Sequence, residues 1–347
     1  MIFGYQNSQA PVKLVDRLDR GLKKAGIQRH TGKDENAKAS TTCLGVDFED
    51  GRFVCPHVRK LAKVMAGTLC FLDGSHLMSP VELSALLGHL TWFALLARPV
   101  LSCFHDVYKH SQANSSDRCV LSGAATAELS LYLGLLPLLE GDLWRPWQDC
   151  IVATDASEAF GFGVSVAQAP SDLTRRIAHQ CAAPSVFVRL DSHGDAADSP
   201  ERVRWGNPYT VPLSRGCFTT MVSSRARFAS HSGSLEASGV SLGLRWLLRS
   251  ASRHSKRTLL LVDARAVLGA VAKGRSSAPT IRRELMRIAG LLLAGDLHLH
   301  LAYIPSEHNP ADAPSRGIVH KWRRGRAQPW KVSRTKTSAV GSPAGSI

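Results

Sequence analysis

The segment CIVATDASEAFGFGVSV, residues 150–166, decides how the rest of the chain is understood. Residues 151–154 are apolar or β-branched and run directly into Asp155. Small residues follow, and then residues 160–166 form a second apolar run that is interrupted by glycines. This pattern predicts two strands joined by a tight connection. A carboxylate at the end of a buried strand is costly to desolvate unless a cation meets it, so Asp155 is either a turn residue or a metal ligand.

The composition indicates a folded and strongly basic chain. Its 347 residues are enough for two or three domains, and 44% of them are hydrophobic, so a packed core is expected. Lysine and arginine exceed aspartate and glutamate by 43 to 28, which gives a net charge of +15. This excess favours a polyanionic partner such as nucleic acid, although a basic protein without such a partner has the same composition. The eight cysteines form no C-x-x-C pair, so neither a zinc site nor a redox pair is expected.

Two segments bear on where the protein resides. The N-terminal stretch MIFGYQNSQ has no charged region and no long apolar core, so we expect no signal peptide and an intracellular protein with reduced thiols. The most apolar segment, residues 83–104, is interrupted by His89, Arg98 and Pro99. It is expected to be a buried helix and not a membrane span, so no membrane partner is predicted.

The first half of the chain predicts helices and one hairpin. Asp50 and Gly51 are typical of a hairpin turn. Ser79, followed by proline and then Glu82, is a helix-start signal, and Pro99 is expected to end that helix at about residue 97. The expected elements are an amphipathic helix at residues 12–26, a hairpin at 43–56 and helices at 79–97 and 124–139.

The second half predicts an α/β arrangement. Residues 168–215 are rich in proline, serine, aspartate and arginine, and predict an insertion or long loop with one short strand at residues 202–205. The elements expected beyond it are a helix at 235–251, a strand at 259–262 followed by a helix, a helix at 281–293, a strand at 297–305 and a short helix near residue 312. This order predicts a mixed sheet with flanking helices. The basic tail, residues 318–347, is expected to be disordered.

Four carboxylates occupy comparable places in these elements. Asp155 and Asp263 end apolar strands, Glu236 starts a helix and Asp312 lies at a loop-to-helix junction. Four acids brought together repel one another and need cations, and all-oxygen ligands favour Mg²⁺ or Mn²⁺. Two such ions would activate a water and stabilise the leaving oxygen of a phosphodiester. Taken singly, Glu236 is equally explained as a favourable first-turn charge, and Asp263 and Asp312 as helix caps.

These motifs resemble the ribonuclease H (RNase H) domain of retrotransposon reverse transcriptases, closest to the tyrosine-recombinase type. The resemblance rests on T-D-A-S around Asp155, L-E-A at Glu236, L-V-D-A-R at Asp263 and N-P-A-D-A-P-S-R at Asp312. It implies an RNase H-like mixed sheet with flanking helices, and cleavage of the RNA strand of RNA–DNA hybrids. It also implies that these four carboxylates are catalytic residues that hold two Mg²⁺ or Mn²⁺ ions. The last motif also has Asn309, Ser315 and Arg316 in register.

The upstream half resembles other parts of the same polyproteins. Residues 43–56 resemble the end of a reverse-transcriptase palm, Lys33 resembles its late lysine, and residues 86–99 resemble the thumb or connection region. The resemblance therefore implies a palm end at residues 1–65, a helical thumb or connection at 66–148, an RNase H-like domain at 149–317 with the insertion at about 168–215, and the tail at 318–347.

The chain departs from the family pattern in three places. The paired aspartates of the polymerase are absent, and I-F-G at residues 2–4 matches what normally follows them, so no DNA synthesis is expected from this chain alone. The interval between Asp155 and Glu236 is wider than in the family, because of either a benign insertion or decay of the third strand that should flank the site. His308 occupies a variable position of the last motif and is expected to be a surface residue.

Substrate would be bound through phosphate contacts to a basic surface. The expected nucleic-acid-binding residues are Arg282, Arg283, Arg316, Lys321, Arg323 and Arg324, each of which is equally explained as part of a solvated face. A competing interpretation is a catalytically inactive, nucleic-acid-binding remnant. The intact acids favour the nuclease, whereas the lost polymerase motif and the long insertion favour the remnant. A transposase or integrase nuclease of the same fold leaves the thumb-like region unexplained, and the oligomeric state stays open.

Overall fold

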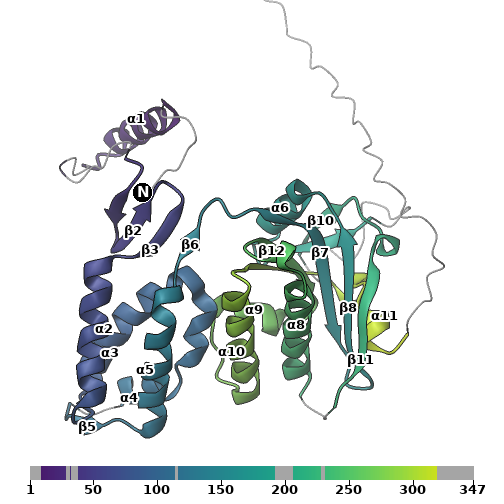
Figure 1. Ribbon diagram of the computed structural model, residues 1–347. Helices are drawn as coiled ribbons and strands as arrows, with labels where there is room; N and C mark the ends of the chain where they lie inside the picture. Colours follow the sequence, from purple (N-terminus) through teal and green to yellow (C-terminus); the bar gives the residue numbers. More distant parts are fainter. Residues whose placement is uncertain are drawn as a thin grey trace, which may run out of the picture.

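The structure is a computed structural model and describes residues 9–28, 32, 38–113, 116–191, 206–227 and 231–318. It has a helical N-terminal region with a small sheet, and a C-terminal α/β region built on a larger sheet (Figure 1). The mixed α/β class predicted from the sequence is confirmed.

A five-stranded mixed sheet forms the centre of the C-terminal region, in the order β11-β8-β7-β12-β13. β8 pairs antiparallel with both β7 and β11, whereas β12 runs parallel to β7 and β13 runs parallel to β12. The strands are β7 (Trp147–Ala156), β8 (Gly161–Gln168), β11 (Thr219–Arg225), β12 (Arg257–Val262) and β13 (His298–Tyr303). The predicted hairpin around Asp155 is therefore confirmed as β7 and β8. The strands that carry Asp155 and Asp263 are neighbours.

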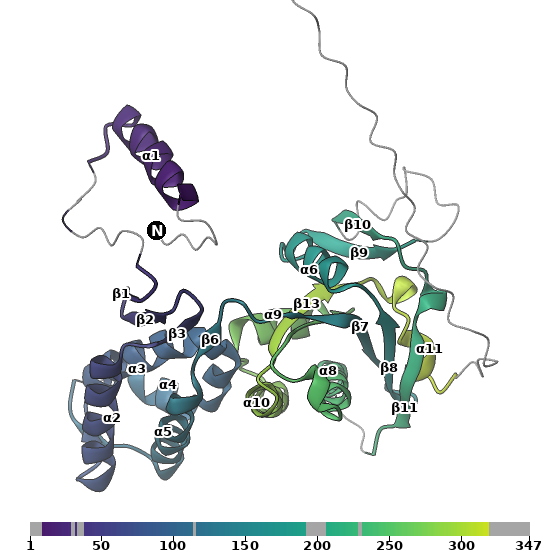
Figure 2. The ribbon, with the colours of Figure 1, turned by 45° about the horizontal axis from the view of Figure 1, so that its top comes forward.

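Three helices cover one face of this sheet, namely α8 (Ser232–Leu248), α9 (Arg265–Lys273) and α10 (Pro279–Ala294) (Figure 2). Apolar side chains of these helices, such as Leu244 and Ile288, form one cluster with Val152 and Leu260 of the sheet. Glycine lets α8 approach β7 closely, because a Cβ added at Gly243 would lie 2.8 Å from Cγ2 of Thr154. The start of α8 is thereby held beside the end of β7.

The other face is covered by chain that the sequence predicted to be an insertion or loop. Within residues 168–215 the structure has a helix, α6 (Ser171–Gln180), and a parallel strand pair, β9 (Val186–Leu190) with β10 (Asn207–Val211). Leu173 and Ile177 of α6 pack with Ile151 of the sheet in a second apolar cluster. The loop prediction is wrong for these segments, because a short amphipathic helix such as α6 gains its stability from the sheet it covers. The strand expected at residues 202–205 lies outside the described residues.

The third strand, β11, was not predicted. Most of its residues are only half-buried, and its sequence TTMVSSR has no apolar run. It pairs with β8 at the sheet edge, next to Gly161, where an added Cβ would lie 2.2 Å from the carbonyl oxygen of Ser224. The alternative that this strand has decayed is therefore wrong.

The N-terminal region begins with α1 (Gln9–Lys24), which confirms the predicted amphipathic helix. A small sheet follows in the order β1-β2-β3-β6, with strands β1 (Thr41–Cys43), β2 (Val46–Glu49), β3 (Phe53–Pro56) and β6 (Gly141–Asp142). The predicted hairpin is formed by β2 and β3, and Asp50 and Gly51 take positive φ angles of 52° and 61° at its turn.

Helices form the rest of this region. The predicted helix start at Ser79 is confirmed, since its hydroxyl accepts from the backbone N–H of Glu82 and its own N–H donates to the Glu82 carboxylate. The α-helix ends at Ala94, earlier than expected, and continues as a 3-10 segment that kinks at Ala97 and contains Pro99. These elements are α2 (Val58–Asp73), β4 (Leu77–Met78), α3 (Pro80–Ala94), η2 (Leu95–Cys103), α4 (Asp106–Ser111), β5 (Cys119–Val120), α5 (Gly123–Leu135) and η3 (Leu136–Leu138).

The segment Pro80–Cys103 is, by length and composition alone, apolar enough to cross a membrane, with a mean hydropathy of 1.3 and 33% of its most apolar window buried. A single such helix is weak evidence for a span, because core helices of other proteins pass the same test. Here Leu90 and Phe93 pack with Tyr132 of α5 in one apolar cluster, which also includes Ala289 of α10. This packing agrees with the predicted buried helix and joins the two regions of the chain.

Candidate metal centre

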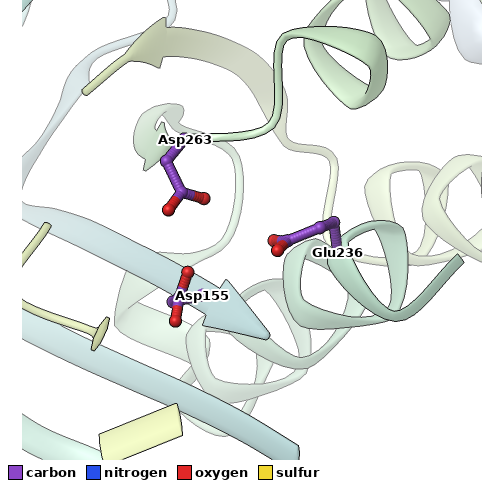
Figure 3. Close-up of side chains that lie close together, drawn as sticks. All are labelled: Asp155, Glu236 and Asp263. Carbon is purple, nitrogen blue, oxygen red and sulfur yellow. The ribbon is translucent and has the colours of Figure 1, made fainter. Parts of the chain in front are cut away.

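Three of the four predicted carboxylates converge at the carboxyl ends of two inner strands of the larger sheet (Figure 3). Asp155 lies near the end of β7, Asp263 directly follows β12, and Glu236 lies in the first turns of α8. One ligand oxygen from each lies within 4.8 Å of the others. The two aspartates meet because β7 and β12 are neighbouring parallel strands, so their carboxyl ends lie side by side at the same end of the sheet.

Asp155 is the most buried of the three, with 5% of its surface exposed. The hydroxyl of Ser315 donates to its Oδ2. Burial, and then the charge of Asp263, raise the pKa of Asp155 to about 8. An isolated carboxylate in such a place favours its protonated form, and a cation would reverse that preference.

Glu236 is placed by the close approach of its helix. A Cβ added at Gly239, one turn further along α8, would lie 3.5 Å from the carbonyl oxygen of Asp155. The backbone N–H of Ala156 donates to the Glu236 carboxylate, whereas Oε2 is buried without a partner among the described residues. Burial, followed by the charges of Asp263 and Asp155, raises the pKa of Glu236 to about 9.

As in Glu236, one carboxylate oxygen of Asp263 accepts a hydrogen bond and the other is buried without a partner among the described residues. Its Oδ2 accepts a hydrogen bond of 2.6 Å from the hydroxyl of Ser306, in the short segment η6 (Ser306–His308). Its Oδ1 is buried and has no partner in the described part of the chain. Each of the three acids thus has one oxygen held by a neutral donor, and in Asp263 and Glu236 the other oxygen is buried and unbonded.

Asp312 lies beside this group but is engaged differently. It begins α11 (Asp312–Ser315), and its Oδ1 accepts from both Nε and Nη2 of Arg316, at 3.0 and 2.9 Å. The Ser315 hydroxyl that donates to Asp155 also lies 2.7 Å from the backbone carbonyl oxygen of Asp312, and the charge of Asp312 adds to the raised pKa of Asp155. The structure therefore brings three of the predicted residues into one group and places the fourth next to it, in an ion pair.

The last motif, N-P-A-D-A-P-S-R, docks onto the sheet through side chains that the sequence did not explain. Asn309 is 1% exposed and donates to the carbonyl oxygen of Thr154 at 3.1 Å, one residue before Asp155. Ser165 of β8 donates to the carbonyl of Pro310 at 3.0 Å. A Cβ added at Gly163 would lie 2.3 Å from the carbonyl oxygen of Ala311, so glycine allows the docking.

The serines that hold the acids had no role in the prediction from sequence. Ser315 was in register with the family motif, but its bond to Asp155 joins residues that lie far apart in the chain. Ser306 was missed entirely, because a lone serine after a strand resembles any turn residue. Both contacts follow from the docking of residues 306–315 against β7 and β12.

The other predicted residues are distributed as follows. Arg282 and Arg283 lie near the start of α10. This end of α10 lies beside the start of α8, as shown by the side chain of Ile281, which lies 3.4 Å from a Cβ added at Gly233. Arg283 is exposed, and His308 is partly buried and has a partner. The residues that lie outside the described part of the chain are Lys33, Lys321, Arg323 and Arg324, as well as residues 2–4.

The three acids fit a hard divalent cation. All of their available donors are carboxylate oxygens, which Mg²⁺ and Mn²⁺ prefer. The pKa values of Asp155 and Glu236 are raised, which indicates that the site lacks positive charge. Its carboxylate oxygens are already in place as ligands. The strand order, the strand directions and the acids at the strand ends define a mixed α/β protein with an acidic group at the carboxyl ends of two parallel strands.

Comparisons with known proteins add little to this assignment. No protein-family model matches the sequence, and no curated protein matches it. Two solved structures of a foamy viral protease-reverse transcriptase match this chain at low similarity. The one in complex with double-stranded DNA has a TM-score of 0.31 and 12% identity, over 86% of this chain and 44% of that chain. The one in complex with an RNA/DNA hybrid has a TM-score of 0.30 and 11% identity, over 91% of this chain and 58% of that chain. The chain thus spans about half the length of these proteins, and the likeness is too low to support a function.

Proposed function

We propose that the chain is a metal-dependent endoribonuclease of the RNase H type, which hydrolyses the RNA strand of RNA–DNA hybrids with two Mg²⁺ or Mn²⁺ ions. The observation that carries the proposal is the group formed by Asp155, Glu236 and Asp263, whose ligand oxygens lie within 4.8 Å of one another. The group stands at the carboxyl ends of two parallel strands of an RNase H-like sheet.

The residues of the chain have separate tasks in this proposal. Asp155, Glu236 and Asp263 would hold a cation, and Asp312 would complete the site for a second one. Bound ions supply an activated water and stabilise the leaving oxygen of the phosphodiester. Ser315 and Ser306 orient the two aspartates by holding one oxygen of each. Because their pKa values are raised, Asp155 and Glu236 must lose protons before a cation is bound.

The hybrid would be held by a basic surface. Arg282 and Arg283 are candidates because α10 begins beside the start of the helix that carries Glu236. The other proposed phosphate-binding residues lie in the last motif and the tail, namely Arg316, Lys321, Arg323 and Arg324. Contacts of this kind are made to phosphates, so affinity should fall steeply with salt.

The family resemblance supplies the proposal for the remaining domains. Residues 1–65 would be a palm end and residues 66–148 a thumb or connection. Purified protein should show no primer extension on a DNA or RNA template, since the polymerase aspartates are not in the sequence.

A cleavage assay tests the proposal. The purified chain is incubated with an RNA–DNA hybrid labelled on the RNA strand, with Mg²⁺, with Mn²⁺ and with chelator. Cleavage that needs the ion and is lost in Asp263→Asn supports the nuclease, and single-stranded RNA of the same sequence is the substrate control. Salt-dependent binding of the hybrid without cleavage in either ion would instead establish the inactive remnant.

A further inference from the structure

Asp312 differs from the other three acids in the kind of donor that holds it. Ser315, Ser306 and the backbone N–H of Ala156 are neutral donors to the three clustered acids. Asp312 is instead held by a cation, because both Nε and Nη2 of Arg316 donate to its Oδ1. No described cation therefore balances the clustered acids, whereas the charge of Asp312 is already balanced by Arg316.

The guanidinium of Arg316 also lies in the field of the clustered acids. Its pKa is raised first by the hydrogen bonds and charge of Asp312, and further by the charges of Asp155 and Asp263. A dication bound to Asp312 would have to share this space with a positive side chain, which is unfavourable.

We propose that Arg316 is a resident countercharge that separates the binding of the two cations. The first ion binds to Asp155, Glu236 and Asp263 with Arg316 in place. The second ion binds only when Asp312 exchanges Arg316 for the ion. This inference rests on the proposed metal-dependent function and specifies how its site is regulated.

The exposure of the pair indicates that this exchange is accessible. The side chains of Arg316 and Asp312 are 60% and 30% exposed, so water screens their attraction. Pairs of this kind contribute little, and removing Arg316 should tighten binding of the second ion by about two- to fivefold at low ionic strength. The first ion should bind unchanged.

Titration calorimetry with Mn²⁺ on the metal-free, full-length chain, without nucleic acid, tests the proposal. We expect two classes of site in the wild type. Arg316→Gln should tighten only the weaker class, and Arg316→Lys, which keeps the charge, should stay close to the wild type. Ser306→Ala should weaken only the tighter class, since it frees Asp263 from its donor. Arg245→Gln, on the exposed side of α8, is the matched control, and far-ultraviolet circular dichroism checks folding.

The possible results separate this inference from the proposed function. If Arg316→Gln weakens the second class or leaves it unchanged, Arg316 orients Asp312 and the countercharge proposal is wrong, while the nuclease stands. If the wild type shows only one class of Mn²⁺ site, the proposal is supported when Arg316→Gln reveals a second class. It is overturned when Arg316→Gln also shows one class. No Mn²⁺ binding by any variant, together with no hybrid cleavage, would overturn both.

Discussion

Opposite charges gather at the two ends of the larger sheet. The carboxyl ends of β7 and β12 hold Asp155 and Asp263, whereas the same strands begin near Arg145 and at Arg257. The pKa values of Asp155 and Glu236 are raised mainly by burial, and burial also lowers those of Arg257 and of His300 on β13. Both ends therefore disfavour the charged forms of their own side chains.

The two ends differ in how that cost is met. At the basic end, Arg145 forms an ion pair with Asp296, and Arg257 donates to the carbonyl of Leu143 at 2.8 Å. The ring of His300 packs against that of Trp147 in a tilted arrangement, with ring centroids 4.5 Å apart. At the acidic end, no described cation pairs with the three clustered acids, and Arg316 pairs with Asp312 instead. The basic end thus has an internal ion pair, although Nε of Arg145, Nε of Arg257 and Nε2 of His300 are buried without a partner among the described residues, whereas the three clustered acids have no such pair.

The largest effect is expected from removing a clustered acid. Asp155→Asn and Asp263→Asn should each lower the hybrid-cleavage rate by at least about 10³-fold, because each removes a carboxylate that would hold an ion. Asp149→Asn, an exposed acid at the other end of β7, should keep the wild-type rate. Single-turnover rates with Mg²⁺ measure this, and a cleaving Asp263→Asn variant would show that the acidic end has no catalytic role.

Breaking the balance at the basic end should affect stability and not ion binding. Arg145→Leu leaves Asp296 without its partner and should lower the free energy of unfolding by about 1–3 kcal/mol, less than for a fully buried pair because Asp296 is half-exposed. Urea denaturation measures the change. The Mn²⁺ affinity of the folded variant should match the wild type, and a large loss of that affinity would mean that the two ends are coupled.

The acidic end should make the metal-free protein less stable as pH rises. The folded-state pKa values of about 8 for Asp155 and about 9 for Glu236 lie above their ordinary values, so the folded state holds its protons more tightly. The resulting stability is fully present below about pH 4 and is lost as pH rises towards 8–9. Thermal melts in chelator should show this fall, and Mg²⁺ or Asp155→Asn should reduce it. A metal-free melting temperature that is constant over this range would contradict it.

The smallest effect is expected from the basic end, in the opposite direction. The pKa of His300 is lowered to about 3, first by burial and then by the charge of His298. The unfolded chain therefore binds a proton that the folded chain rejects, and stability is lost as pH falls from about 6.5 towards 3. His300→Leu should flatten this acid limb in chelator without changing the alkaline one. An unchanged acid limb would show that His300 does not contribute to it.

Patterns that lie within one segment were predicted well. The hairpin at Asp50 and Gly51, the capped helix at Ser79 and the strands that end at Asp155 and Asp263 all have local signals. The helix α6 and the edge strand β11 were missed, because their stability comes from the sheet they cover or extend. The long polar segment between α6 and β11 made the whole stretch resemble a loop in the sequence.

The roles of the site residues divide in the same way. Residue type, together with a position at the end of an apolar strand or at the start of a helix, was enough to select Asp155, Glu236 and Asp263 as candidates for a hard cation. The donors Ser306, Ser315 and Arg316 could not be assigned, because each bond depends on where residues 306–316 dock. Asp312 was selected with the other three, and its pairing with Arg316 appeared only in three dimensions.

By itself, the sequence determined a basic α/β chain with acids at the ends of two buried strands, because periodicity and side-chain chemistry are local properties. The tertiary structure alone decided that Asp155, Glu236 and Asp263 share one site, with one oxygen of each held by a neutral donor, and that Asp312 is paired with an arginine. Such distinctions depend on distances of a few ångströms between segments far apart in the chain, to which electrostatic energies and hydrogen bonds are sensitive.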